Sequence, residues 1–311
     1  MEYKGTVTSV NISVEKGTTK QPVPEATLTM KGIVEDAHAG AWHRQVSLLA
    51  AEHIEQFARQ LGRTVAPGEF AENITTRGID LAKVAILDKI CLGSAVLEVT
   101  QIGKTCHGDG CAIFREVGKC VMPKEGVFAR VVKEGQVRAG DPVSLRPRPL
   151  TLSVITLSDR ASRGEYADRS GPRVEALWEE HFQQTRWHCE VTRQVLPDDP
   201  QQLEQALLGA RDTPIDVVIT TGGTGVGPRD FTPDVVRKLA DKEIPGIMEY
   251  IRVHYGQKKP NALLSRSVAA VMGTTLVYAL PGSVKAVNEY MAEILKSVEH
   301  LILMLHQVDA H

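Results

Sequence analysis

The stretch 215-IDVVITTGGTGVGPRDFTPD-234 decides the fold of the second half of the chain. An apolar run typical of a buried strand leads into a turn rich in glycine, and Pro233 then begins a helix. Glycines let backbone N–H groups approach an anion closely, and the helix places its positive end nearby, so the turn suits a phosphate. Glycines after a strand also form ordinary tight turns, and this alternative stays open. No Gly-Lys-Ser/Thr follows, so the turn is not a P-loop, and it is not the dinucleotide fingerprint either.

Apolar runs alternate with helical patterns on both sides of this stretch. We expect strands at 151–158, 189–196, 215–223, 268–272 and 275–280, and helices at 171–184, from 200, from 233 and at 283–306. This alternation is typical of a doubly wound α/β sheet, which binds ligands at the carboxyl ends of its strands.

Aspartates follow two of these predicted strands. Asp198 and Asp199 lie in 196-LPDDP-200, and Asp230 and Asp234 lie within or beside the glycine turn. Carboxylates next to bound phosphates repel them unless a hard cation lies between, so we expect Mg²⁺ here. Helix capping before Pro200 and Pro233 is the alternative, and for Asp199 it is the favoured role. Two further turns are expected at the same end of the predicted sheet. One is 158–172, with hydroxyls and arginines, and the other is 280–287, with Gly282, Ser283 and Lys285.

The first half has a different pattern. Short β-like runs at 5–14, 26–34, 94–103, 127–132 and 142–147 are separated by turn residues, with one amphipathic helix predicted at 47–62. This pattern predicts a small β-barrel with helical insertions. Pro147 and Pro149 interrupt the chain before the next apolar run, so we place the boundary there and expect domains at 1–148 and 149–311.

Composition excludes several functional classes. The 311 residues include 42% hydrophobic ones and carry a net charge of −2, so no broad attraction to nucleic acid or anionic lipid is indicated. The apolar runs are too short to span a membrane, and the start lacks the apolar core of a signal peptide. We therefore expect a cytoplasmic protein with reduced thiols, and no membrane or nucleic-acid partner.

Two polar clusters in the first half are candidates for chemistry. Three cysteines with a histidine allow a zinc site, inert packing thiols, or a reactive thiolate assisted by His107 or Lys104. Histidines in a turn before the predicted helix, with Asp and Arg beside them, suit an oxyanion, although capping and solvated charge also explain them. The cysteines are Cys106, Cys111 and Cys120, and the predicted anion site comprises Asp36, His38, His43, Arg44, Gln45, Asn73 and Arg130.

Six motifs of the second half, in this order, resemble the molybdopterin adenylyltransferase family, whose relatives include a domain of gephyrin: VITLSDRASRGEYADRSGP, LPDDP, TTGGTGVGPRDFTPD, IPGIMEYIR, LLSRSVAAV and LPGSVKAVNE. The resemblance covers residues 151–307. It implies a trimer that takes Mg-ATP and molybdopterin, transfers AMP to the terminal phosphate of the pterin, and releases pyrophosphate.

The same resemblance implies roles for individual residues. Asp198 and Asp230 match the two important aspartates of the family and would hold Mg²⁺. Other matching positions would bind the phosphates or line the pterin pocket: Ser158, Asp159, Arg160, Thr221, Gly222, Gly223, Thr224, Gly225, Asp234, Ser265, Arg266, Ser267, Pro281, Gly282 and Ser283.

The first half is similar to the MOSC domain, named for the C-terminal domain of molybdenum cofactor sulfurase. The matching motifs over residues 1–147 are DAHAGAWHRQVSLL, PGEFAENITTRGIDL, IGKTCHGDGCAIF, GKCVMPKEGVFARV and VRAGDPV. The resemblance implies a β-barrel that handles the molybdenum cofactor or its sulfur through a cysteine. Cys106 is the favoured equivalent of the family's cysteine, with Cys111 second and Cys120 third. Cys106 and Cys111 are the candidate ligands of a molybdenum site.

Together the two resemblances predict a bifunctional enzyme of molybdenum cofactor assembly. The second half would adenylylate molybdopterin, and the barrel would bind the molybdenum or tungsten cofactor, with a molybdenum insertion protein or a molybdoenzyme as an expected partner. Two alternatives stay open: a non-catalytic cofactor carrier, and sulfur transfer by the barrel as the main activity. Pyrophosphate release from Mg-ATP and molybdopterin separates the carrier from the enzyme, and alkylation of Cys106 separates the two enzymes.

Overall fold

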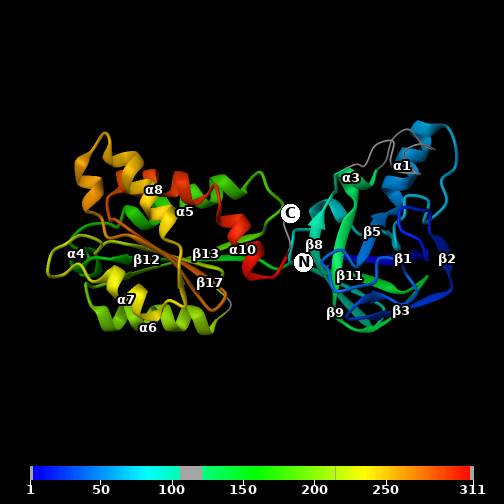
Figure 1. Cartoon of the computed structure of the whole chain (residues 1–311), viewed down its shortest axis with the longest axis horizontal. Helices are drawn as coiled ribbons and strands as arrows, with labels where there is room; N and C mark the ends of the chain where they lie inside the picture. Colours follow the sequence, from blue (N-terminus) through cyan, green and yellow to red (C-terminus); the bar gives the residue numbers. More distant parts are fainter. Residues whose placement is uncertain (1–2, 106–120, 214, 309–311) are drawn as a thin grey trace. The chain divides into compact units, whose positions relative to one another are not determined.

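The chain forms two compact units, Met1–Arg148 and Pro149–His311 (Figure 1). The structure is a computed structural model, and it describes residues 3–105, 121–213 and 215–308. The predicted cysteines 106, 111 and 120, together with His107, lie outside the described residues. Within the described residues, no helix is both long enough and apolar enough to cross a membrane.

The first unit is a closed barrel of seven strands, which confirms the predicted β-barrel. The strands pair in the order β11-β7-β8-β9-β5-β6-β1, and antiparallel pairing of β1 with β11 closes the ring. Their bounds are β1 Tyr3–Ile12, β5 Val46–Ala50, β6 Ile74–Arg77, β7 Lys89–Leu92, β8 Ala95–Ile102, β9 Val127–Lys133 and β11 Pro142–Arg146. Closure pairs the backbone N–H and C=O groups that the edge strands of an open sheet leave unpaired.

Smaller elements complete the barrel unit. The strand β2 (Gln21–Val23) extends the sheet beside β1, and a second sheet has the order β10-β3-β4. The bounds are β3 Glu25–Thr29, β4 Gly32–Ile33, β10 Gly135–Arg138, α1 Ala51–Leu61, η1 Leu81–Lys83 and α3 Met122–Glu125. The helix predicted at 47–62 begins only at Ala51, because residues 46–50 are fully buried and pair as β5 with β6 and β9.

The second unit is an α/β sheet of six strands, as predicted. The order is β13-β12-β14-β17-β16-β15, in which the first four strands are parallel, β16 pairs antiparallel with β17, and β15 pairs antiparallel with β16. The bounds are β12 Leu150–Leu157, β13 Cys189–Leu196, β14 Val217–Thr221, β15 Lys242–Glu243, β16 Val268–Met272 and β17 Thr275–Leu280. Every residue of β14 and β17 is buried, as expected for strands covered on both faces.

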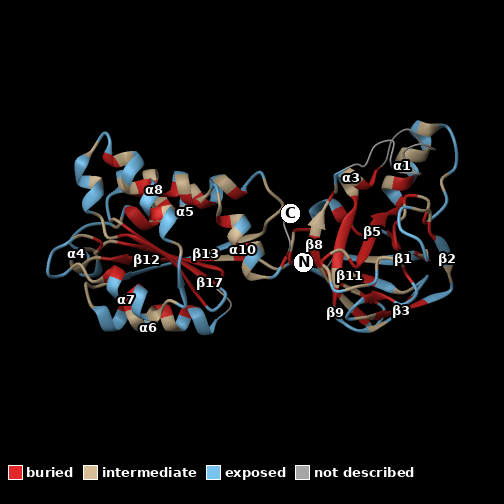
Figure 2. Cartoon of the chain, in the orientation of Figure 1, coloured by how far each residue is buried: buried red, intermediate tan, exposed pale blue. Residues whose placement is uncertain are grey.

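Helices cover both faces of this sheet. The helices α6 and α7 lie on one face, and α5, α8 and α10 lie on the other (Figure 1), so that the buried strands are enclosed between exposed helix surfaces (Figure 2). The bounds are α4 Asp159–Ser162, α5 Ser170–Phe182, α6 Pro200–Asp212, α7 Thr232–Leu239, α8 Pro245–Gly256, η3 Pro260–Leu264, α9 Val284–Ile294 and α10 Val298–Leu305. The single helix predicted at 283–306 is therefore two, α9 and α10, joined by a turn that buries both Ile294 and Val298.

Each unit has its own apolar core, so we expect each to fold alone. The barrel core gathers side chains from all seven strands, and a separate core lies between the α/β sheet and its helices α6 and α7. Fragments 1–148 and 149–311 should each unfold cooperatively, because burial within one unit does not need the other. Thermal unfolding followed by circular dichroism checks this. A fragment without a cooperative transition would contradict it.

Candidate functional site

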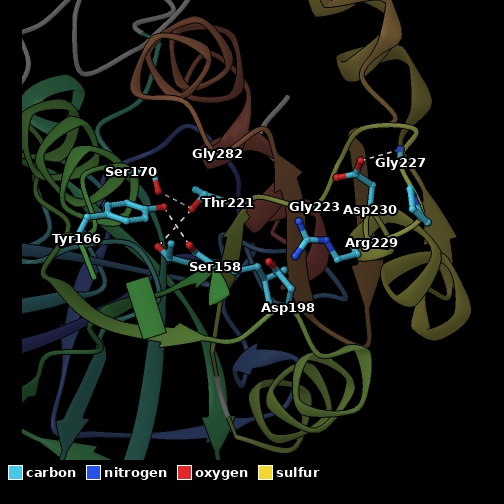
Figure 3. Close-up of a pocket in the computed structure, with 13 residues that line it drawn as sticks. Ser158, Tyr166, Ser170, Asp198, Thr221, Gly223, Gly227, Arg229, Asp230 and Gly282 are labelled. Carbon is cyan, nitrogen blue, oxygen red and sulfur yellow. Dashed lines mark hydrogen bonds between the residues drawn. The ribbon is translucent and has the colours of Figure 1, made fainter. Parts of the chain in front are cut away.

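The carboxyl ends of the four parallel strands border a cavity of about 340 Å³. The loops that follow β12, β13, β14 and β17 contribute its walls, which is where α/β sheets bind ligands. Figure 3 shows hydroxyl side chains on one side of the cavity and charged ones on another. The lining residues are Thr156, Leu157, Ser158, Tyr166, Ser170, Asp198, Thr221, Gly223, Gly227, Pro228, Arg229, Asp230 and Gly282.

The hydroxyl side of this first cavity is organised by Asp168. Its carboxylate accepts hydrogen bonds from Thr156 Oγ1 at 2.8 Å and from Ser170 Oγ at 2.9 Å. Thr221 Oγ1 lies 2.9 Å from Ser170 Oγ and 3.3 Å from Thr156 Oγ1. Three buried hydroxyls are thereby fixed at the end of the sheet. Thr221 was predicted, whereas Thr156 and Ser170 were missed, because single hydroxyl residues in strands and turns carry no distinctive sequence pattern.

The predicted first turn contributes only part of its residues to the cavity. Ser158 caps the helix α4 by accepting from the Ala161 N–H, and its Oγ lies 3.0 Å from Tyr166 Oη. Arg160 does not line the cavity: its guanidinium lies over the Tyr166 ring, 4.9 Å from the ring centre. Tyr166 is a lining residue that the sequence did not single out.

Asp198 is held at the cavity by a reciprocal contact with Asp159. The Asp198 N–H donates to Asp159 Oδ1 at 3.0 Å, and the Asp159 N–H donates to Asp198 Oδ2 at 3.3 Å. Arg229, also on the cavity wall, lies 3.4 Å from Asp159 Oδ2 and offsets part of this negative charge. Asp199 caps the helix α6 by accepting from the N–H groups of Gln201 and Gln202, as predicted.

The glycine turn after β14 is tightly constrained, as Gly222 and Gly225 show. Gly222 has a φ of 108°, and a Cβ there would lie 2.5 Å from the Leu157 carbonyl oxygen. A Cβ on Gly225 would lie 2.6 Å from Asp230 Oδ2, so the turn wraps closely around this carboxylate. Asp230 Oδ2 also accepts from the Gly227 N–H at 2.8 Å. The turn therefore holds the Asp230 carboxylate at the cavity wall.

A second cavity of about 530 Å³ adjoins the first. The two cavities share Gly223, Asp230 and Gly282, so they form one continuous site. The wall of the second cavity is more apolar, with Ala262, Leu264, Pro281 and Ala286 among its residues. The remaining lining residues are Thr224, Gly225, Lys259, Asn261, Ser265, Ser283, Lys285, Glu289 and Tyr290.

Three predicted pocket residues, Asp234, Arg266 and Ser267, line neither cavity. Ser265 lines the second cavity, and its hydroxyl lies 2.7 Å from that of Ser267, which is buried. Arg266 donates to the Asp230 carbonyl at 3.1 Å and forms an ion pair with Asp234. Arg266 and Asp234 therefore brace the glycine turn from outside rather than facing the cavity.

The Gly222→Ala substitution should strongly destabilise the fold. The new methyl group would meet the Leu157 carbonyl in a left-handed conformation, at a cost of about 2 kcal/mol or more in the free energy of unfolding. Chemical denaturation measures this cost. Gly246→Ala is the matched control, because a Cβ there meets no atom within 4 Å. Equal stability of the two variants would contradict the constraint.

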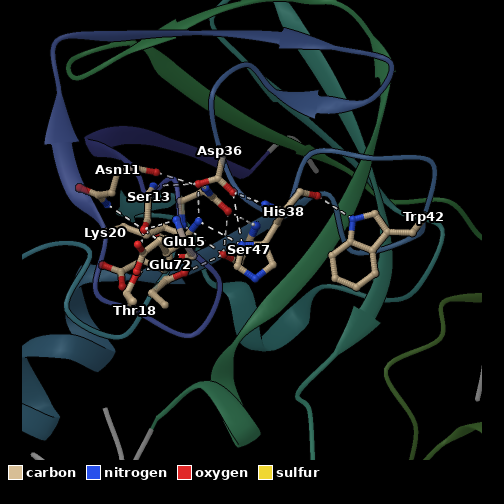
Figure 4. Close-up of polar contacts among 12 residues, drawn as sticks. Asn11, Ser13, Glu15, Thr18, Lys20, Asp36, His38, Trp42, Ser47 and Glu72 are labelled. Carbon is tan, nitrogen blue, oxygen red and sulfur yellow. Dashed lines mark hydrogen bonds and ion pairs between the residues drawn. The ribbon is translucent and has the colours of Figure 1, made fainter. Parts of the chain in front are cut away.

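The barrel contains a buried polar cluster centred on Asp36 (Figure 4). Its carboxylate forms an ion pair with the buried Lys20 and accepts from Asn73 Nδ2 at 3.0 Å and from the Ser13 N–H at 3.1 Å. The His38 N–H donates to the other oxygen at 2.9 Å. Burial opposes ionisation of Asp36, but hydrogen bonds from His38 and Lys20 outweigh it and lower the pKa of Asp36 well below its usual range.

Only part of the predicted anion site is brought together here. Asp36, His38 and Asn73 meet in the cluster, whereas His43 Nε2 lies 3.2 Å from Gln101 Oε1. Arg130 pairs with Glu98 on the neighbouring strand, with Nη2 at 2.6 Å from Oε1. The predicted Arg44 lies over the Trp42 ring, and Gln45 bridges the backbone of Met30, Gly40 and Val131.

Two cysteines are among the described residues, Cys91 and Cys189, and both are free thiols. Burial raises the pKa of Cys189 to about 11, so this thiol is almost entirely protonated at neutral pH. The α/β unit therefore gains no reactive thiolate from Cys189.

The Asp36→Asn variant tests the barrel cluster. It should lower the free energy of unfolding by about 3 kcal/mol at pH 7, because it leaves Lys20 buried opposite a neutral group. A depressed carboxyl pKa stabilises the fold above the unfolded pKa, about 4 for aspartate, and this stabilisation is lost as the pH falls further. Urea unfolding between pH 3 and 7 should thus show a weaker acid dependence in the variant. Glu25→Gln, at an exposed position, is the control.

Comparison with known families finds two matches along the chain. Residues 153–300 match the family described as a probable molybdopterin binding domain, and residues 35–144 match the MOSC domain. The two matches fall in the α/β unit and the barrel unit, respectively.

Individual relatives match the α/β unit. The molybdopterin adenylyltransferase of Haemophilus influenzae is 38% identical over 45% of this chain and 70% of its own length. The molybdenum cofactor biosynthesis protein B of Bacillus cereus is 33% identical over 52% of this chain and 94% of its own length. Gephyrin of Dictyostelium discoideum is 32% identical over half of this chain, which spans only 22% of gephyrin's length.

Proposed function

The chain belongs to the molybdopterin adenylyltransferase family of molybdenum cofactor biosynthesis through its α/β unit, and from that premise we propose that this unit adenylylates molybdopterin. ATP and molybdopterin would give adenylyl-molybdopterin and pyrophosphate. The name of the Haemophilus relative supports this reaction, and the name of the Bacillus relative supports a role in molybdenum cofactor biosynthesis. The match of the barrel unit to the MOSC domain is consistent with the same pathway.

One observation carries the proposal: two adjoining cavities share the edge formed by Gly223, Asp230 and Gly282. A reaction between two phosphate-bearing substrates needs their reacting groups side by side, with the rest of each substrate in its own pocket. A glycine-rich edge suits this, because small residues let both phosphates approach the backbone. The polar first cavity would take the nucleotide phosphates, and the more apolar second cavity the pterin.

The donor set of the first cavity fits Mg²⁺. Asp198 and Asp230 both line it, and each has one carboxylate oxygen that accepts no hydrogen bond from the described residues. Mg²⁺ is usually held by one or two carboxylates together with substrate phosphates and water, so two aspartates are sufficient. The described residues contain no cluster of three or more His, Cys, Asp or Glu that would form an all-protein metal site. The ion would supply charge neutralisation of the ATP phosphates.

Adenylyl transfer between the two substrates would need little covalent participation by residues of the chain. An oxygen of the terminal phosphate of molybdopterin would attack the α-phosphorus of ATP, and the bond from this phosphorus to the bridging oxygen of pyrophosphate would break. The backbone of Thr221–Gly225 would orient the phosphates, and the hydroxyl of Thr221 would donate a hydrogen bond to them, while the Ser170 hydroxyl stays bound to Asp168. Arg229 would offset developing charge near Asp198.

For the barrel unit, we propose binding of the molybdenum or tungsten cofactor, or a metal–sulfur form of it, through Cys106 or Cys111. The match of residues 35–144 to the MOSC domain supports this role. Assembly as a homotrimer, and delivery to a molybdenum insertion protein or a molybdoenzyme, are parts of the same proposal.

The Asp198→Asn and Asp230→Asn variants should each lower the rate of pyrophosphate release by about 100-fold or more. Each removes a charged metal ligand that contributes several kcal/mol to the transition state. Binding of molybdopterin alone should be nearly unchanged, because the pterin cavity keeps its shape. A coupled pyrophosphate assay and equilibrium binding measure the two effects.

The matched control is Asp199→Asn, one position along the chain. Asn caps a helix as well as Asp does, and this residue does not line either cavity, so activity should be retained. Full activity of Asp230→Asn would contradict the assignment of the metal site. Pterin binding without any pyrophosphate release by the unaltered chain would favour the carrier alternative.

A further inference from the structure

Two lysines of the second cavity lie close enough to interact with each other. Lys259 precedes η3 and Lys285 lies in the first turn of α9, so they come from segments separated along the chain. Both line the second cavity, and Lys259 forms an ion pair with Glu289, which lies one turn beyond Lys285 on α9, so the two lysines belong to the same end of the cavity. The positive charge of Lys259 lowers the pKa of Lys285. Holding two positive charges together costs free energy, which an anion between them would recover.

One carboxylate only partly offsets this charge. Lys259 forms an ion pair with Glu289, one turn further along α9 than Lys285. Among the described residues, Lys285 has no carboxylate within salt-bridge distance. The other carboxylate of this cavity, Asp230, belongs to the edge shared with the first cavity. The lysine end of the cavity therefore has one positive charge in excess.

We propose that Lys259 and Lys285 form a binding site for a phosphate group in the second cavity, and that Glu289 occupies Lys259 when the phosphate is absent. The proposal rests on the proposed function, because it assigns part of a substrate to this end of the cavity. Two lysines are suited to a phosphate as mobile point charges. The phosphate would come either from the polyphosphate of the nucleotide or from the single phosphate of the pterin.

Glu289 gives the proposal a signature that a structural lysine pair would not have. If Glu289 competes with the anion for Lys259, then Glu289→Gln should free this ammonium group without changing the shape of the side chain. Anion affinity should then rise several-fold. If the three residues only stabilise the packing of α9, the same substitution should leave anion affinity unchanged and lower the melting temperature.

The experiment measures binding of inorganic pyrophosphate and of inorganic phosphate to the full-length chain by isothermal titration calorimetry, without Mg²⁺. Lys285→Met and Lys259→Met should each weaken binding by about tenfold, with a shallower salt dependence. Lys258→Met is the matched control, because this exposed neighbour does not line the cavity. Melting temperatures identify any variant that fails to fold, and Glu289→Gln then remains as an independent test.

The two probes distinguish the two sources of the phosphate. If the lysine variants lose affinity for pyrophosphate alone, the site binds the polyphosphate of the nucleotide. If they lose affinity for both probes equally, the site binds a single phosphate such as that of the pterin. Unchanged affinity in both lysine variants, or an equal loss in Lys258→Met, would overturn the proposal. Because no turnover is measured, this result is independent of whether the unaltered chain releases pyrophosphate from ATP and molybdopterin.

Discussion

Parallel pairing of β12 with β13 and β14, and of β14 with β17, is the constraint on which the α/β site depends. It brings four loops, distant in sequence, to one edge of the sheet. Ser158, Asp198, Thr221 and Gly282 lie at or just beyond the carboxyl ends of four different strands, and this arrangement brings them to the same cavity. A one-residue slip in register would move each side chain to the opposite face of the sheet and displace the residues at the strand ends from the cavity.

The sequence predicted the frame of this site well, because its signals are local. An apolar run followed by glycines and Pro233 locates a strand, a turn and a helix without any tertiary information. It also placed Asp199 as a cap, which depends on two N–H groups close in sequence. Lys259, Tyr166 and Ser170 were missed as site residues, since each reaches the cavity only through the packing of separate elements.

The barrel shows the same limit more clearly. Short β-like runs separated by turn residues predicted a barrel, but they did not predict that residues 46–50 would pair as a strand instead of starting the expected helix. Arg130 was predicted to belong to an anion site, but it forms an ion pair with Glu98, its neighbour on the adjacent strand. The strand register that brings these two residues together cannot be deduced from a single sequence. Lys20 was missed because a lysine is rarely buried, and its burial is offset by the opposing Asp36 together with the charge of Glu72.

Closure of the barrel by β1 and β11 pairs Tyr3 with Leu145, and almost the full length of the unit separates these two residues in the sequence. During synthesis, β1 can pair earlier with β2 and β6, but the part of its edge that pairs with β11 stays unpaired until nearly all of the barrel has left the ribosome. An unpaired strand edge is exposed over this interval, and long-range pairing of this kind is slow. Most pairings of the α/β unit follow within far fewer residues. The barrel unit therefore exposes an unpaired strand edge for longer than the α/β unit does, and such edges favour aggregation.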